Sequence, residues 1–99
     1  MAKYAALTVR KLKPGSYEEW RAAWEGDPEN WPKGVHAYIL RNLNDPDEII
    51  AFGLTDRSLD EIRAEGMEEE QQARNEAMAP HIDSTGADGF YEVIDEVTG

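Results

Sequence analysis

The segment VHAYILRNLNDPDEIIAFGLT, residues 35–55, consists of two apolar runs separated by a short polar connection. The runs VHAYILRN (35–42) and EIIAFGLT (48–55) are rich in β-branched and aromatic residues, which predicts two strands. The connection LNDPD (43–47) contains Asn, Asp and Pro residues, which favour a turn. Because this connection is short, we expect the two strands to pair as an antiparallel hairpin.

A strand and a helix are predicted before the hairpin. Residues 3–12, KYAALTVRKL, alternate with a period of two, which is typical of a strand. Ser16 and Glu19 have the spacing of a capping box, in which each side chain satisfies a backbone N–H at the start of a helix. This helix is expected to end at about Glu25, because Gly26 suits a left-handed C-cap.

A second helix and a last strand are predicted after the hairpin. Ser58 and Glu61 form a second capping box, which opens a helix that is broken or bent at Gly66 and continues until Pro80. Residues 89–97, GFYEVIDEV, alternate again and are predicted to form the last strand.

The predicted order is therefore β-α-β-β-α-β, in a single domain that spans residues 1–99. Two split βαβ halves with right-handed crossovers place both helices on one face of a four-stranded antiparallel sheet. The predicted class is α+β, with a ferredoxin-like arrangement.

Both faces of this sheet are predicted to be apolar. In the strand 48–55, Ile50, Phe52 and Leu54 lie on one side, and further apolar residues lie on the other. Two helices cover only one face, and an uncovered apolar face of several hundred Å² is unusual on a monomer. We therefore expect a homodimer that packs sheet against sheet about a two-fold axis.

The composition argues against several classes of protein. With 21 acidic and 10 basic residues the formal charge is −11, which repels nucleic-acid phosphates and anionic membrane surfaces. No apolar run approaches the roughly 20 residues of a membrane-spanning helix, and the N-terminus lacks the pattern of a signal peptide, so a cytoplasmic protein is expected. Without cysteine there is no disulfide and no thiolate nucleophile.

An acidic run follows the hairpin. Eight acidic residues and three arginines lie between Asp56 and Glu76. The run is interpreted as a solvated helix face, or alternatively as a contact surface for a partner.

The chain resembles the dimeric α/β-barrel superfamily, in particular its antibiotic-biosynthesis-monooxygenase-like (ABM-like) members. The resemblance is carried by KPGSYEEW, by AYILRNLNDPDEIIAFGLTD leading into SLDEI, and by GFYEVIDEV, and it covers nearly the whole chain. It implies a homodimer and an activity of the kind shown by cofactor-independent monooxygenases on small aromatic or polyketide-like molecules. These motifs belong to the scaffold, so they do not establish a reaction.

Haem-degrading members of the superfamily resemble this chain in topology, and they use an asparagine in the first strand with a tryptophan and a histidine at the second helix. The first strand here offers Leu7, Thr8 and Val9, and residues 59–78 contain no tryptophan. Only His81 lies in a matching place. A haem-binding or haem-degrading protein is therefore the weakest alternative.

The histidines have two interpretations each. His81 is either a cap that interacts with the C-terminal end of the second helix or a general base at the mouth of a cavity between helices and sheet. His36 and Tyr38 share one side of their strand, which lines either that cavity or a dimer interface. In the enzyme hypothesis, His81, His36 and Tyr38 are the candidate catalytic residues.

Candidate ligand-binding residues come from aromatic and polar positions. Trp20 and Trp24 belong to a helical stripe that also suits a core, whereas Trp31 in a Pro-rich loop suits either a lid over a pocket or the sheet edge. Arg74 and Gln71 interrupt an apolar line at helical spacing, as a pocket wall would. Tyr91 in the last strand completes the candidates.

Neither a metal nor a cofactor is predicted. The two histidines are far apart, and NLNDPDE and DSTGADG lack the spacing of a calcium loop, so both segments are interpreted as turns. Two hypotheses remain. The chain is either an enzyme that holds an aromatic ligand between helices and sheet, or a non-catalytic dimer that binds a small molecule or a protein. In the second hypothesis, Trp20, Trp24 and Met78 fill the cavity.

Overall fold

The chain follows the predicted β-α-β-β-α-β order, with the second helix in two parts. The computed structural model describes residues 3–31, 34–64 and 68–99. The elements are β1 (Tyr4–Leu12), α1 (Tyr17–Glu25), the short 3₁₀ helix η1 (Pro28–Asn30), β2 (His36–Asn42), β3 (Asp45–Thr55), α2 (Leu59–Ala64), α3 (Glu68–Met78), the 3₁₀ helix η2 (Ala79–His81) and β4 (Ile82–Glu92).

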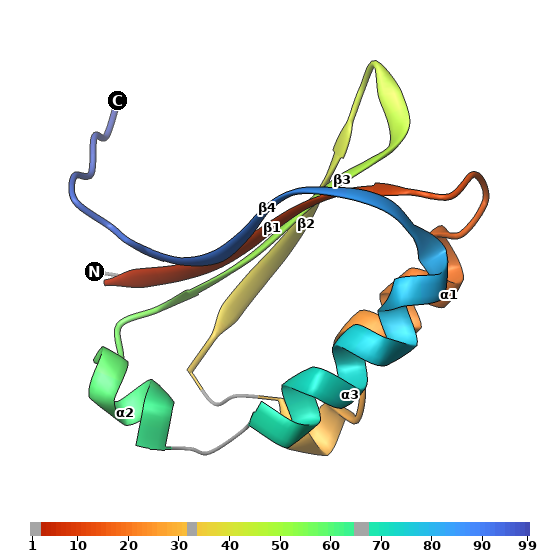
Figure 1. Cartoon of the computed structure of the whole chain (residues 1–99). Helices are drawn as coiled ribbons and strands as arrows, with labels where there is room; N and C mark the ends of the chain where they lie inside the picture. The colour runs from red at the N-terminus through yellow and green to blue at the C-terminus, as the bar shows by residue number, and fades with distance from the viewer. Residues whose placement is uncertain (1–2, 32–33, 65–67) are drawn as a thin grey trace.

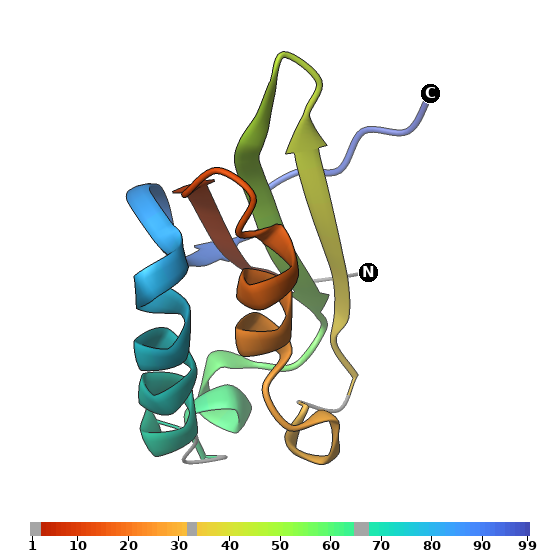
Figure 2. The ribbon, with the colours of Figure 1, turned by 90° about the vertical axis from the view of Figure 1, so that its right-hand side faces the viewer.

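The four strands form one sheet in the order β2-β3-β1-β4, and each neighbouring pair is antiparallel. All helices lie on the same side of the sheet, with α2 at the far end from α1 and α3 (Figure 1). Figure 2 shows α1 and α3 next to each other against the sheet. The predicted α+β class and ferredoxin-like topology are therefore confirmed.

The core forms where α1 and α3 meet the sheet. In the strands, Thr8 pairs with Ala51 and Ala51 with Ile39, and such cross-strand partners share a face. The residues that are at most 3% exposed come from this face and from the two helices; they are Leu12, Trp20, Ile49, Ala51 and Met78. The odd positions of β3 and the even positions of β1 therefore face the helices.

The opposite face of the sheet carries apolar side chains that no helix in the described parts of the chain covers. Tyr38, Leu40 and Tyr91 are 53%, 46% and 47% exposed. The ring of Tyr38 stacks on Phe52 of the neighbouring strand, with centroids 5.4 Å apart. The structure thus agrees with the sequence analysis that both faces of the sheet are apolar.

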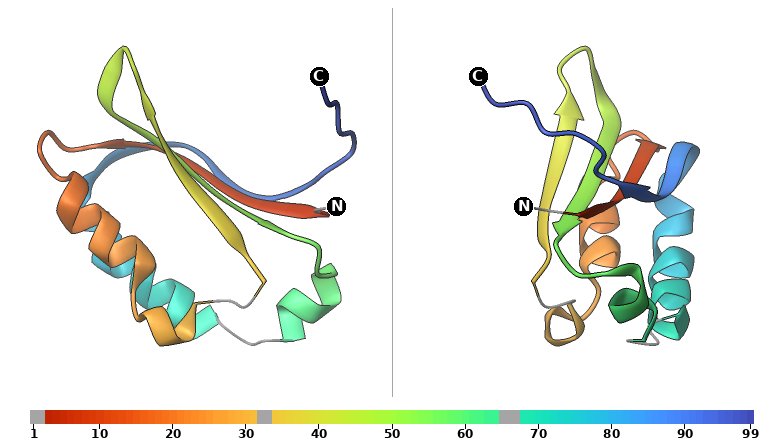
Figure 3. Two further views of the ribbon diagram at one scale, coloured as in Figure 1. Left: turned by 180° about the vertical axis from the view of Figure 1, so that it is seen from behind. Right: turned by 90° about the vertical axis from the view of Figure 1, so that its left-hand side faces the viewer.

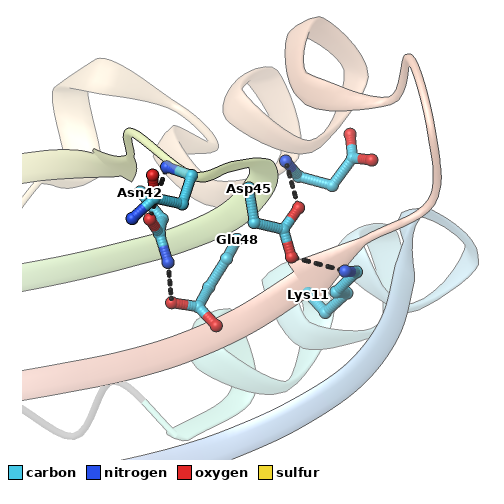
Figure 4. A network of polar contacts seen from close by, with 6 residues as sticks. Lys11, Asn42, Asp45 and Glu48 are labelled. Carbon is cyan, nitrogen blue, oxygen red and sulfur yellow. Dashed lines mark hydrogen bonds and ion pairs between the residues drawn. The ribbon is translucent and has the colours of Figure 1, made fainter.

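A polar network closes the β2–β3 hairpin (Figure 4). The amide of Asn42 donates to Glu48 at 3.0 Å and accepts from the backbone N–H of Asn44 at 2.8 Å. Lys11 of β1 forms an ion pair with Asp45 at the start of β3. The predicted hairpin is confirmed, although β3 begins at Asp45, three residues earlier than predicted.

The two predicted capping boxes have different outcomes. Ser16 precedes α1, but its side chain makes no capping hydrogen bond, so the Ser16–Glu19 box is wrong. Ser16 has ψ 8°, whereas an N-cap side chain reaches the helix from an extended backbone. Ser58 Oγ does accept from the backbone N–H of Glu61 at 3.2 Å. The predicted break at Gly66 lies outside the described residues.

The last strand is the largest error of the sequence analysis. β4 spans residues 82–92 rather than 89–97, and DSTGADG lies inside the strand rather than in a turn. This segment is an edge strand that pairs with β1 through two register shifts, so it needs no regular apolar alternation. After Glu92 the chain leaves the sheet, as Figure 3 shows, and Ile94 and Val97 are exposed.

No helix within residues 3–31, 34–64 and 68–99 has the length and apolar character that crossing a membrane requires.

Candidate functional site

A cavity of about 590 Å³ lies between the sheet and the helices. Residues from all four strands, from α1, α2 and α3 and from the segment after η1 line it. This volume falls within the range of about 300–1,000 Å³ that is typical of small-molecule sites.

Small residues on the helix-facing side of the sheet leave this space open. Ala6, Ala37, Ala51 and Gly53 lie on the floor of the cavity. At Gly53 a Cβ atom would approach Val35 Cγ1 to 2.8 Å, which is closer than side chains tolerate. The small side chains of Ala6, Ala37 and Ala51 therefore take up little of the space between sheet and helices, whereas Val35 fills the space beside Gly53.

Two indole rings form one wall of the cavity. Trp24 of α1 and Trp31 after η1 both line it, and their ring centroids are 4.9 Å apart. Phe90 of β4 adds a third aromatic side chain that is 63% exposed. Trp31 thus lies at the pocket, which is one of the two places that its sequence context suggests. Aromatic walls of this kind suit a flat, apolar ligand.

The charged groups in the lining are mainly cationic. Arg57, Arg63 and Arg74 all line the cavity, and they are the three arginines of the acidic run. Asp88 is the one acidic residue in the described lining, and its carboxylate lies 3.4 Å from Nη2 of the buried Arg10. The acidic run therefore presents its positive charges to the cavity.

Arg74 is held in place by contacts along its whole length. Its Nη2 donates a hydrogen bond to Gln71 Oε1, and its guanidinium carbon lies 5.9 Å from the centre of the Trp31 ring. Its stem passes over Gly26, where an added Cβ would lie 3.0 Å from Arg74 Cδ. Gly26 has φ 63°, so the chain turns sharply there to leave α1. Gln71 and Arg74, whose helical spacing suggested a pocket wall, both line the cavity.

The candidate catalytic residues do not come together at the cavity. His36 and Tyr38 lie on the opposite face of the sheet, as Tyr91 does, because they alternate with the cavity-lining Ala37 in β2. His81 is half-buried in η2, directly after α3, where its backbone carbonyl accepts from Lys13 N–H at 3.0 Å. The described lining contains no histidine. Their catalytic roles stay predictions.

The two remaining tryptophans of the prediction divide between core and cavity. Trp20 is fully buried in the core and does not belong to the lining, whereas Trp24 does. Trp24, Met78 and their neighbours form a wall without filling the space, so the filled cavity expected for a purely non-catalytic dimer is not observed.

Several lining residues were absent from the prediction. Asp88 was missed because the last strand was predicted to begin at residue 89, whereas Phe90 lay inside the predicted strand, from which only Tyr91 was proposed. Arg57 and Arg63 were missed because the acidic run was interpreted as a solvated face. The helical spacing that revealed Gln71 and Arg74 has no counterpart in the short α2.

Within the described parts of the chain, no group of three or more His, Asp or Glu side chains is arranged to hold a metal ion.

A known protein shares this arrangement of sheet and helices. It is a crystal structure from Chloroflexus aurantiacus described as a "putative Antibiotic biosynthesis monooxygenase", and the match covers 98% of this chain and 98% of that chain with a TM-score of 0.69. This chain has the ABM-like fold. The resemblance predicted from sequence is thus confirmed for the fold, and the 15% sequence identity carries no residue roles. No family model and no curated protein matches the sequence.

Proposed function

We propose that this ABM-like chain binds a small aromatic molecule in the cavity between sheet and helices. The observation that carries the proposal is the open volume of about 590 Å³ behind the paired indoles of Trp24 and Trp31. Ligand sites are mostly apolar cavities with a few polar groups that fix orientation. Here Arg74 and its neighbours on α3 supply those groups.

The binding proposal can be tested with a neutral fluorescent probe, N-phenyl-1-naphthylamine, which brightens in apolar sites. The variant Ala37→Phe places a ring in the floor of the cavity, and we expect it to abolish the fluorescence increase. Ala22→Phe is the matched control, because Ala22 is exposed on α1 outside the lining. Equal probe binding in both variants would contradict the proposal.

A second candidate function is oxygenation of the bound ligand without a cofactor. The described identity of the Chloroflexus aurantiacus protein favours it. In such a reaction an electron-rich ring loses a proton, reacts with O₂ at carbon, and leaves as a quinone while the second oxygen atom becomes water. Asp88 is the carboxylate in the described lining that would accept the proton through the oxygen not paired with Arg10, and Arg74 would stabilise the resulting anion.

Oxygen uptake with 1,5-dihydroxynaphthalene, measured without any added cofactor, tests this candidate. We expect one O₂ consumed for each quinone formed, and a loss of turnover in Asp88→Asn. Asp83→Asn is the matched control, since Asp83 is an exposed residue of the same strand. His81→Ala and His36→Ala test the histidines predicted from sequence. Uptake that is no faster than in buffer would reject the oxygenase and leave the binding proposal intact.

We also propose that two copies pair through the uncovered face of the sheet. The exposure of Tyr38, Leu40 and Tyr91 on one face supports this proposal, because such apolar surfaces are usually covered. Tyr38→Glu is expected to convert a dimer into a monomer in light scattering coupled to size exclusion. Leu43→Glu, at a fully exposed residue of the hairpin turn, should leave the mass unchanged. A monomeric native protein at micromolar concentration would contradict the pairing.

A further inference from the structure

We infer that the aromatic ligand of this cavity carries a carboxylate, which the guanidinium of Arg74 binds. The inference rests on the proposed ligand-binding function and adds the chemical class of the ligand. It follows from the position of Arg74, from its hydrogen bonds and from the distribution of charge around the cavity.

Arg74 lacks an acidic partner within the part of the chain that the structure describes. Among the described residues, its one hydrogen bond goes to the neutral amide of Gln71, and no carboxylate lies within ion-pair distance of it. Glu70 stands one helical turn before Arg74, at a spacing that allows an ion pair, yet no such pair forms. The side chain is instead directed along the cavity wall.

The Nε atom of Arg74 is buried and has no hydrogen-bond partner among the described residues. A guanidinium has five N–H donors in a planar fork that matches the two oxygens of a carboxylate. A buried donor without an acceptor costs free energy, which an incoming oxyanion would recover. Arg74 is therefore prepared for a bidentate anion.

The local charge of the cavity opposes the charge of the whole protein. The chain carries a formal charge of −11, but the described lining holds three arginines and one acidic residue, Asp88. The carboxylate of Asp88 is already engaged by Arg10. Arg57 is paired with Glu61 at 3.8 Å. The cationic group beside the tryptophan wall is Arg74, whose guanidinium carbon lies 5.9 Å from the centre of the Trp31 ring.

The neighbouring side chains complete the site for such a ligand. The guanidinium carbon of Arg74 lies 5.9 Å from the centre of the Trp31 ring, so an aromatic ligand bound to Arg74 would also lie near this indole. Asn75 of α3 also lines the cavity; its Oδ1 accepts from Gln71, and its amide N–H groups can donate to the remaining lone pairs of the carboxylate. The site thus places the aromatic rings of Trp24 and Trp31 next to the guanidinium of Arg74.

Displacement of bound N-phenyl-1-naphthylamine by two competitors of the same shape tests the inference. The competitors are 2-naphthoate, which is anionic, and 2-naphthamide, which is neutral. We expect 2-naphthoate to bind about tenfold more tightly than 2-naphthamide to the native protein. In Arg74→Met this preference should fall to about one, while the affinity for 2-naphthamide stays the same.

Arg41→Met is the matched control, because Arg41 stacks over Tyr17 outside the cavity lining. Arg74→Gln, which keeps a polar end on the stem, is measured in parallel, and circular dichroism reports whether each variant folds. Equal binding of the two competitors to the native protein would overturn the inference without any variant. A loss of preference in Arg41→Met as large as in Arg74→Met would also overturn it.

Different results would contradict ligand binding and carboxylate recognition. If the neutral probe and 2-naphthamide bind but charge makes no difference, the binding proposal stands and the carboxylate inference is wrong. If the probe does not bind to the native protein at all, the binding proposal fails and the carboxylate inference fails with it.

Discussion

Trp20 is the side chain whose role the structure defines most sharply, and its replacement by alanine tests the core. The residue is fully buried, and its ring lies 6.0 Å from Tyr17 and 6.1 Å from Trp24. A buried tryptophan removes about 150–250 Å² from water, which corresponds to roughly 4–6 kcal/mol at about 25 cal/mol per Å². Substitutions of buried aromatic residues by alanine cost about 3–5 kcal/mol in practice.

One feature of Trp20 places the expected value at the lower end of this range. Its Nε1–H is buried and has no acceptor among the described residues, which costs about 1–3 kcal/mol in the native protein. The alanine variant no longer carries this cost. We therefore expect Trp20→Ala to lower the free energy of unfolding by about 3 kcal/mol, a large part of the stability of a domain of this size.

Urea unfolding followed by circular dichroism measures this difference. Native and variant proteins are compared at one protein concentration, because the stability of an associating protein depends on concentration. Trp31→Ala, at the half-buried ring in the cavity wall, is the control. Compared with Trp20→Ala, it should lower the free energy of unfolding less and the affinity for the naphthylamine probe more. A loss below about 1 kcal/mol in Trp20→Ala would refute the assignment of Trp20 to the core. Weaker binding of the naphthylamine probe to the conservative variant Trp20→Phe would instead indicate that Trp20 contributes to ligand binding.

Three further changes have defined outcomes. Met78→Ala removes a buried side chain that lines the cavity, so it should destabilise the protein by about 2–5 kcal/mol in urea unfolding and admit a bulkier naphthylamine. Gly53→Ala should destabilise the protein by about 1–3 kcal/mol, because the new Cβ would lie 2.8 Å from Val35 Cγ1. A midpoint of thermal unfolding equal to that of the native protein would contradict this close approach. The hydrogen bond from Lys11 lowers the pKa of Asp45 below its ordinary 3.8, and the same bond raises the pKa of Lys11 above 10.5. The stabilisation from Asp45 is thus present above pH 3.8 and is lost as the pH falls through its lowered pKa. The stabilisation from Lys11 is present below pH 10.5 and is lost as the pH rises through its raised pKa. Lys11→Met should therefore weaken both pH dependences of the unfolding free energy, and 1 M NaCl should reduce them.

The fold was predictable because three of the four strands have regular side-chain patterns. The alternation in residues 3–12 and the paired apolar runs of 35–55 predict β1, β2 and β3 close to their observed bounds. β4 was misplaced because its first half, DSTGADG, holds polar residues and glycines. Its strand conformation is set by pairing with β1, which is a tertiary interaction that local sequence does not contain.

The candidate site was predictable only where one helix contributes a regular series. The spacing of Gln71 and Arg74 on α3 indicated a polar stripe in an apolar wall, and both residues line the cavity. The sheet side of the cavity depends instead on which face of each strand meets the helices. His36 and Ala37 are adjacent in sequence but point to opposite faces, so their assignment required the three-dimensional register.

Gly26 lies outside the cavity, yet it contacts the stem of the arginine that we propose as the carboxylate-binding group. The stem of Arg74 crosses the space where a side chain at this position would stand, and the backbone there has the positive φ that glycine adopts without strain. A larger residue would shift the guanidinium away from Trp31 while every residue of the lining stayed the same. Among related sequences, position 26 would then tune preference for charged over neutral ligands from a distance, and comparisons limited to cavity residues would overlook it.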